Sequence, residues 1–218
     1  MKNLILIAAP GAGKGTLANA LVEKYNYIHI STGDLLRDIV KSGTPLGEKI
    51  KGIQEKGLLV DDELVYEVLK NRLEKPDVKN GIILDGFPRN IEQAKKYDEI
   101  ISELNIDLGE AILLDVDESI LINRITGRRI CSKCGEIYNI NNPEMMPKNE
   151  GVCDKCGSDL YQRNDDNEES LKVRYKTFVE QTKPLIDFYE NKNCLSRVDA
   201  GNNPDDTLNQ VSEIIKEV

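Results

Sequence analysis

The sequence predicts an α/β chain built on a doubly wound, parallel, five-stranded sheet. Two observations lead to this prediction. Short apolar runs of strand length recur at 4–8, 27–30, 81–85, 111–116 and 195–198. Stretches with helical spacing of apolar residues separate these runs, and strands that alternate with helices pair in parallel and bind ligands beyond their carboxyl ends. With 218 residues, 39% of them hydrophobic, the chain can bury such a core without disulfides.

Local patterns predict the individual elements in order. Residues 4–8 form a continuous apolar run, as expected of a strand that is buried on both faces of a parallel sheet. A helix is predicted at 14–25 from apolar residues spaced three and four apart. Residues 31–34 and 61–64 each offer side-chain acceptors for the free N–H groups of a helix N-terminus. The last helix is predicted from four apolar residues on one face, Leu208, Val211, Ile214 and Ile215.

Two segments interrupt the alternation of strands and helices. Residues 31–60 have helical patterns with no strand between them, and residues 128–164 are rich in Cys, Asn, Gly and Pro with little periodicity. Both are interpreted as insertions near the ligand end of the sheet. We therefore predict one core domain over 1–218, with inserted subdomains at 31–60 and 127–164.

The charge and composition restrict the class of partner. The formal net charge is −9, whereas a general binder of duplex DNA or of anionic membranes is normally basic. The absence of tryptophan argues against a large stacking surface for single-stranded nucleic acid. The apolar run at 4–9 is too short to span a membrane and leads into a Gly-rich turn. We therefore expect a cytoplasmic protein with reduced thiols, a small-molecule ligand, and no nucleic-acid or membrane partner.

The segment 8–16, Ala-Ala-Pro-Gly-Ala-Gly-Lys-Gly-Thr, lies between the first strand and the first helix. Its glycines let backbone N–H groups turn toward phosphate oxygens, and the helix N-terminus adds positive charge. Lys14 supplies a point charge for the β and γ phosphates, and Thr16 can help to hold Mg²⁺. The match to a strict P-loop is imperfect, because Ala8 replaces the first glycine and Gly15 displaces the hydroxyl to Thr16. The context favours a P-loop over an incidental Gly-rich turn.

Four cysteines form two C-x2-C pairs, Cys131 with Cys134 and Cys153 with Cys156, with 18 residues between the pairs. This spacing is typical of a tetrahedral four-thiolate zinc site, whose filled coordination sphere leaves a structural role. The ion would fold a small ribbon that has few apolar residues of its own. Two disulfides, redox dithiols and a nucleic-acid-binding ribbon are the alternatives. Cys194 has no such partner and is expected to be an inert thiol.

An acid and a set of arginines complete the candidate site. Asp85 ends a predicted buried strand beside the P-loop, where it can organise Mg²⁺ through its water shell; the alternative is an Asp that caps a turn. His29, the only histidine, lies in a predicted strand and is interpreted as structural. Phosphoryl transfer needs distributed positive charge, which arginines at the ends of the insertions can supply. These arginines are Arg37, Arg124, Arg128, Arg129, Arg163 and Arg174.

Together these motifs resemble adenylate kinases of the long-lid, zinc-binding type, in the nucleoside monophosphate kinase family. The resemblance covers essentially the whole chain and rests on 9–16, 31–34 with Arg37, 84–89 with Gln93, 127–129 and 163–166. It implies a monomeric enzyme of nucleotide biosynthesis that catalyses ATP + AMP = 2 ADP by in-line transfer with Mg²⁺. It makes 31–60 the AMP-binding subdomain and 127–164 a zinc-binding lid whose closure excludes water.

The resemblance also implies individual roles. The ATP contacts would be Gly11, Ala12, Gly13, Lys14, Gly15, Thr16, Arg128, Ile137, Tyr138 and Asn203. The AMP contacts would be Thr32, Arg37, Leu58, Leu59, Val60, Gly86, Phe87, Pro88, Arg89, Gln93, Arg163 and Arg174. The catalytic set would be Lys14, Asp85, Arg89, Arg124, Arg128, Arg163 and Arg174.

Two departures from the family pattern and three other functions stay open at this point. Ala8 adds a methyl group to the loop, and Asn164 stands where the family often has a lysine, which removes a charge near the lid hinge. The nearest alternative is a kinase for UMP, CMP or GMP. A zinc-ribbon nucleic-acid-binding NTPase and an inactive nucleotide-binding scaffold are the others.

Overall fold

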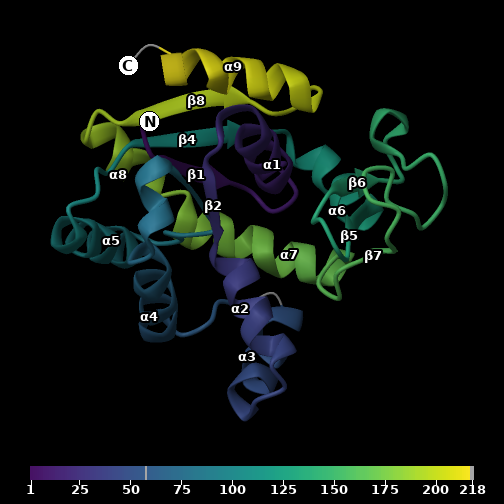
Figure 1. Cartoon of the computed structure of the whole chain (residues 1–218), viewed down its shortest axis with the longest axis horizontal. Helices are drawn as coiled ribbons and strands as arrows, with labels where there is room; N and C mark the ends of the chain where they lie inside the picture. Colours follow the sequence, from purple (N-terminus) through teal and green to yellow (C-terminus); the bar gives the residue numbers. More distant parts are fainter. Residues whose placement is uncertain (57, 217–218) are drawn as a thin grey trace.

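The computed structural model describes residues 1–56 and 58–216. Gly57, which belongs to the predicted 31–60 insertion, and residues 217–218 of the predicted core domain lie outside the described residues. The core is a five-stranded sheet in the order β2-β3-β1-β4-β8, and every pairing between neighbours is parallel (Figure 1). Its strands are β1 (Leu4–Ala8), β2 (Ile28–Ser31), β3 (Ile82–Asp85), β4 (Glu110–Asp115) and β8 (Leu195–Asp199).

This architecture confirms the predicted fold class, and the ends of the predicted strands differ from the observed ones by at most one residue. The strand predicted at 27–30 begins one residue later. Tyr27 is buried, and its hydroxyl donates to the carbonyl of Lys2 at 2.8 Å. Tyr27 therefore looks like a buried strand residue in the sequence, because its aromatic ring is apolar. The backbone pairing of the strand nevertheless begins only at Ile28.

Helices cover both faces of the sheet because successive side chains of a strand point to opposite sides. Ile5 and Ile7 of β1 pack in one core cluster, and Leu4 and Leu6 pack in the other. The first face is covered by α4 (Asp62–Leu73), α5 (Ile91–Leu104) and α8 (Leu185–Asn191), and the second by α1 (Lys14–Tyr25) and α9 (Pro204–Lys216). The buried β1 at the centre thus places the loop after it between two rigid layers.

The first insertion is a pair of helices, α2 (Thr32–Lys41) and α3 (Pro45–Glu55), that extends from the core below the sheet in Figure 1. The Ser31 hydroxyl caps α2 by accepting from the Asp34 N–H at 3.3 Å, and Thr44 caps α3 in the same way. Gly47 lets the two helices approach closely, since a Cβ atom there would lie 2.7 Å from the carbonyl oxygen of Ile39. The insertion is therefore a packed unit.

The second insertion is a small antiparallel sheet, β6-β5-β7, that lies to one side of the core (Figure 1). Its strands are β5 (Arg128–Cys131), β6 (Ile137–Asn139) and β7 (Leu160–Tyr161). The flanking helices are α6 (Leu121–Gly127) and α7 (Glu168–Thr177), and a π-helical turn (Phe178–Thr182) follows α7. Short 3₁₀ turns occur at Pro76–Asn80, Glu118–Ile120 and Pro143–Met145. No helix among the described residues is long and apolar enough to cross a membrane.

Candidate active site

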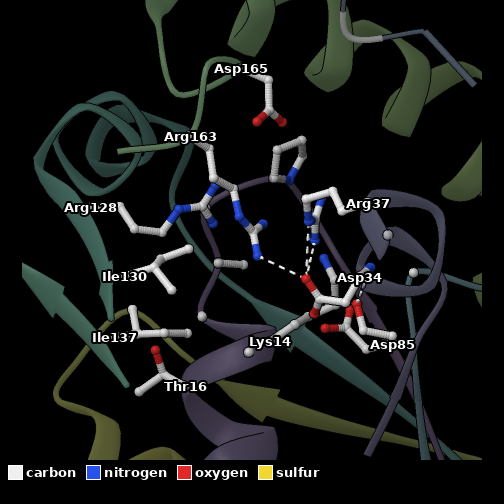
Figure 2. A pocket seen from close by; sticks show the side chains of 18 of the residues that line it. Lys14, Thr16, Asp34, Arg37, Asp85, Arg128, Ile130, Ile137, Arg163 and Asp165 are labelled. Atoms are coloured by element: carbon white, nitrogen blue, oxygen red, sulfur yellow. Dashed lines mark hydrogen bonds and ion pairs between the residues drawn. The ribbon is translucent and has the colours of Figure 1, made fainter. Parts of the chain in front are cut away.

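A cleft of about 950 Å³ opens at the carboxyl ends of the core strands, between the two insertions. It is lined by the loop after β1, the first turn of α2, the turn after β3, and the lid strands β5 and β6. Figure 2 shows Lys14, Asp85 and several arginines converging on this space from different elements. The parallel register explains the convergence, because β2 and β3 end together at the paired residues Ser31 and Asp85.

The loop after β1 has the conformation that its glycines predict. Gly11 and Gly13 adopt φ angles of 86° and 103°, which other residues rarely reach, and Gly13 precedes the first residue of α1. The Lys14 ammonium donates to the carbonyl oxygen of Ala8 at 3.1 Å. Ala8 itself is buried, and its methyl group belongs to the core cluster with α1. The extra methyl is thus accommodated in the core.

Lys14, Asp85 and His29 form the electrostatic centre of the cleft. Burial lowers the pKa of Lys14 to about 8, although the Asp85 charge opposes this shift. Burial alone would raise the pKa of Asp85, but the adjacent His29 side chain and the charge of Lys14 outweigh it and hold that pKa at about 2. His29 Nε2 lies 3.4 Å from Asp85 Oδ2. The acid is therefore ionised, and the lysine is a poorly solvated cation.

Two arginines from opposite insertions share one carboxylate. Arg37 of α2 donates to Asp34 Oδ1 at 2.6 Å and 3.0 Å, and Arg163, which follows β7, approaches the same oxygen at 3.4 Å (Figure 2). Burial and the charges of Arg37 and Arg128 lower the pKa of Arg163 to about 10. Its Nε is buried and has no hydrogen-bond partner within residues 1–56 and 58–216. A buried N–H donor without a partner, on a guanidinium group that neighbouring arginines repel, is suited to bind an anionic ligand.

Two further arginines, Arg128 in the lid and Arg174 in the helix after it, are held by two consecutive acids. Arg128 makes a two-pronged ion pair with the fully buried Asp166. Arg174 of α7 donates to Asp165 Oδ2 at 3.0 Å and lies 3.9 Å from Asp166. These acids keep the guanidinium groups oriented toward the cleft, which both arginines line.

Arg124 and Asn203 have structural partners in the loop before α9. Arg124 donates to the carbonyl oxygens of Ala200 at 2.8 Å and Gly201 at 3.1 Å, so it anchors that loop beside the P-loop. Arg124 lines the cleft, and its catalytic role stays a prediction. Asn203 Oδ1 accepts from the Asp206 N–H in the first turn of α9. Among the described residues that line the cleft, Asn202 is present and Asn203 is not.

The turn after β3 carries several of the predicted AMP contacts. The buried Thr32 hydroxyl donates to the Gly86 carbonyl at 2.9 Å, and Arg89 Nε donates to the same oxygen at 2.7 Å. Gly86, Pro88, Arg89 and Gln93 line the cleft. The Phe87 side chain does not, because it is fully buried between Tyr66 and Tyr97 in edge-to-face contacts. Residues 58–60 complete this side of the lining.

Lid residues face the P-loop across the cleft. Ile137 is close to α1, since a Cβ atom on Gly15 would lie 3.0 Å from Ile137 Cδ1. Tyr138 also lines the cleft, but its hydroxyl lies 3.5 Å from Cys153 Sγ and accepts from the Asp154 N–H at 2.9 Å. Tyr138 therefore connects the cleft side of the lid to the cysteine cluster.

The four lid cysteines fit a metal ion. The sulfur atoms of Cys131, Cys134, Cys153 and Cys156 all lie within 4.8 Å of one another. Zinc bound tetrahedrally at about 2.3 Å would place the sulfurs about 3.8 Å apart. Backbone N–H groups of residues 133 and 134 point at Cys131 Sγ from 3.4 Å, as suits a thiolate. All the cysteines are free, so the disulfide alternative has no support.

Sequence reasoning missed the acids that hold the cations. Asp34, Asp165 and Asp166 lie within the motifs at 31–34 and 163–166, but these motifs do not predict that the acids pair with arginines. His29 was interpreted as a structural strand residue, and the structure also puts it against Asp85. The parallel pairing of the second and third strands, which ends at Ser31 and Asp85, was the available signal for that contact.

Comparisons with known proteins agree with this geometry. The family model described as adenylate kinase matches residues 6–194. An adenylate kinase of Acetivibrio thermocellus is 49% identical over 208 residues, which are 95% of each chain. One of Thermosipho africanus is 46% identical over 98% of this chain and 99% of its own. One of Clostridium tetani is 44% identical over 98% of both chains.

Proposed function

Since the chain belongs to the adenylate kinase family and catalyses ATP + AMP = 2 ADP, we propose how its own residues carry out this phosphoryl transfer. The observation that carries the proposal is the convergence of Lys14 and the arginines on one cleft beside the P-loop. Transfer of a phosphoryl group needs alignment and positive charge more than acid–base chemistry. A cleft with an orphaned Arg163 donor and a desolvated Lys14 offers both.

The ATP phosphates occupy the loop at 11–16. Backbone N–H groups and the N-terminus of α1 hold the phosphates, and Lys14 balances charge that develops between the β and γ phosphates. Mg²⁺ bound with ATP neutralises phosphate charge, with the Thr16 hydroxyl and the ionised Asp85 in place to hold it or its water shell. Ile137 and Tyr138 lie against the nucleoside.

AMP occupies the side of the cleft between α2, residues 58–60 and the turn after β3. Its phosphate is already an ionised nucleophile, so no general base is required and no covalent enzyme intermediate forms. Arg37 and Arg89 hold this phosphate, and Thr32 and Gln93 lie on the same side of the cleft. The transfer then proceeds directly between the two bound nucleotides in line.

The lid and the adjacent helix α7 supply the remaining positive charge when the lid closes. Arg128, Arg163 and Arg174 exchange part of their contacts with Asp34, Asp165 and Asp166 for contacts with phosphate oxygens. The acids hold the guanidinium groups near their working positions, so little reorganisation is needed. Closure also keeps water from intercepting the phosphoryl group.

Zinc is the metal that we assign to the four cysteines, with a structural role. The four sulfurs would fill the tetrahedral coordination sphere of a zinc ion and leave no position for substrate. The lid cluster is small, with Cys131, Tyr138 and Cys153 as its buried residues, so the ion substitutes for a larger apolar core. We further propose that the enzyme acts as a monomer in the cytoplasm.

The acceptor specificity tests this proposal. ADP formation is followed in a coupled assay with MgATP and each of AMP, UMP, CMP and GMP. We expect efficient turnover with AMP only, and Arg89→Met to lower kcat/KM for AMP by about 100-fold. Preferential use of UMP, CMP or GMP would replace the assignment of AMP as the acceptor. ATP binding without any ADP formation would identify an inactive scaffold.

A further inference from the structure

We propose that Asp62 is a positioning residue that fixes the orientation of the Gln93 amide and so makes the acceptor site select a 6-aminopurine over a 6-oxopurine. The inference rests on the proposed placement of AMP in the part of the cleft that Gln93 lines. Asp62 is the first residue of α4, and Gln93 lies in the first turn of α5. These helices are neighbours on one face of the sheet (Figure 1).

The Gln93 amide is held at both of its polar atoms. Its side chain is 2% exposed. Its Oε1 accepts from the backbone N–H of Arg89 at 2.7 Å, and its Nε2 donates to Asp62 Oδ1 at 2.5 Å. In a buried site, each of these partners would be costly to lose.

The two partners allow only one orientation of the amide. A backbone N–H can only donate and therefore requires the amide oxygen, whereas a carboxylate can only accept and therefore requires the amide nitrogen. A rotation by 180° would place donor against donor at Arg89 and acceptor against acceptor at Asp62. The assignment of oxygen and nitrogen thus follows from the chemistry of both neighbours.

This orientation leaves one acceptor and one donor on Gln93 in a fixed order. The amide oxygen keeps a second lone pair, and the amide nitrogen keeps a second N–H. The edge of adenine offers an amino group at C6 beside the acceptor N1, whereas a 6-oxopurine offers an acceptor at C6 beside an N1–H donor. A locked amide therefore matches one of these edges and opposes the other.

The surroundings fit a purine base. Leu36, Val60 and Val65 line this part of the cleft and are buried in the same core cluster. Gln93 is a polar group among these apolar walls, where an unmatched hydrogen bond discriminates strongly between ligands.

Asp62 is not among the described residues that line the cleft, so it acts through Gln93. Burial and the Asp62 charge raise the pKa of Tyr66, on the next turn of α4, to about 12, so its hydroxyl stays protonated beside that carboxylate.

A purely structural role for this contact makes a different prediction. Asn90 Oδ1 accepts from the backbone N–H of Gln93 and so caps α5. The Gln93 side chain in turn accepts from the backbone N–H of Arg89 through Oε1. If Asp62 only reinforced this cap, its loss would lower stability and leave the choice of base unchanged. The choice of base is therefore the decisive measurement.

The test compares Asp62→Asn with Asp61→Asn as a matched control. The amide introduced by Asp62→Asn can either accept or donate, so the orientation of the Gln93 amide is then held at Arg89 alone and no longer at both of its ends. Asp61 carries the same charge one residue earlier, and its side chain makes no capping hydrogen bond to α4. The probes are AMP and IMP, which differ at C6. The measured quantity is the kcat/KM for AMP divided by the kcat/KM for IMP. We expect Asp62→Asn to lower this ratio by about tenfold, which is the effect of losing one hydrogen bond to a charged group. The control should keep the wild-type ratio.

A double-mutant cycle separates positioning from stability. In a Gln93→Ala background, Asp62→Asn should leave the ratio unchanged, because the amide that Asp62 orients is gone. If Asp62→Asn does not fold, Asp62→Ser is the second variant, since the serine hydroxyl also accepts or donates. An unchanged AMP-to-IMP ratio in a folded Asp62 variant would overturn the inference. Wild-type protein that does not use AMP at all would overturn the proposed function instead.

Discussion

Lys14 is a cation that the protein holds out of water. It donates to a single backbone carbonyl at 3.1 Å, and burial brings its pKa down to about 8 despite the Asp85 charge. A phosphate group can therefore bind this ammonium without removing a full hydration shell. The same loop offers glycines at 11 and 13 in conformations that direct N–H groups toward the ligand.

We predict that Lys14→Met lowers kcat by at least about 100-fold, because charge that develops on the transferring phosphate is no longer balanced. The measurement is steady-state turnover with saturating MgATP and AMP. Lys24→Met, on the same helix, is the control, since Lys24 contacts Ser212 at 3.2 Å. Near-normal turnover in a folded Lys14→Met protein would remove Lys14 from the catalytic set.

The pH dependence should report the lowered pKa of Lys14. A lysine with a pKa of about 8 is charged below that pH and neutral above it. We therefore expect kcat/KM for MgATP, which reports the free enzyme, to fall by about tenfold per pH unit above about pH 8. In Lys14→Arg this alkaline limb should disappear from the accessible range. A flat wild-type profile up to pH 10, near an ordinary lysine pKa of about 10.4, would contradict the prediction.

Single residues differed in how well the sequence predicted them. Lys14 and the four cysteines have fixed spacings that carry their own chemistry, so their surroundings could be predicted. Asp34 and Asp62 could not be, because a lone acid in a sequence does not specify its partner. Their partners, Arg163 and Gln93, are 129 and 31 residues away along the chain.

At the scale of elements, the turn after β3 is the most constrained. Gly86 has a φ of 78°, and a Cβ atom there would lie 3.1 Å from Arg89 Nη2 and 3.2 Å from Thr32 Oγ1. The turn therefore needs glycine both for its backbone and for the close approach of two site residues. Its neighbour Phe87 anchors the turn in the core.

We predict that Gly86→Ala lowers stability by about 1–2 kcal/mol, from the left-handed backbone, and lowers kcat/KM for AMP by up to about 100-fold through a displaced Arg89. Thermal unfolding and acceptor kinetics measure the two effects. Gly43→Ala is a matched control, because Gly43 has a φ of 67° and nothing within 4 Å of an added Cβ. It should lose similar stability and keep the kinetics. Equal kinetics in both variants would show that the contact with Arg89 is unimportant.

The lid sheet should depend on its metal. Zinc analysis is expected to give one ion per chain, and Cys156→Ser should lose that ion and lower the melting temperature by about 5 °C or more. Cys194→Ser should keep the metal, since Cys194 lies outside the cluster. If removal of the metal abolished phosphoryl transfer while lid folding and thermal stability stayed intact, the structural role would be wrong.

Most elements could be predicted because the spacing of apolar residues and the capping residues specify them locally. The helix Lys14–Tyr25 begins and ends where the pattern predicts. Several strand ends differ from the prediction by one residue, as at Tyr27, because burial and backbone pairing do not begin at the same residue. The three-stranded lid sheet was not predicted, since its strands of two to four residues are too short to show a period.

At the scale of the whole molecule, the two insertions meet across the cleft. Arg163 reaches Asp34, and Asn164 Nδ2 donates to Glu55 Oε1 at 3.1 Å. Asn164, which takes the place of a lysine in the family pattern, thus keeps a contact with the opposite insertion as a neutral donor. The sequence predicts both insertions at the ligand end of the sheet. It could not give these contacts, because they depend on how the lid lies over the core.

This arrangement encloses the site from both sides, and we infer that a phosphoryl group passes directly between two nucleotides without reaching water. The most direct test follows the label when ATP labelled in its γ-phosphate is mixed with AMP and Mg²⁺. We expect the label to appear in ADP, with two ADP formed for each ATP consumed and inorganic phosphate at background. Label released as inorganic phosphate at a rate comparable to ADP formation would contradict it.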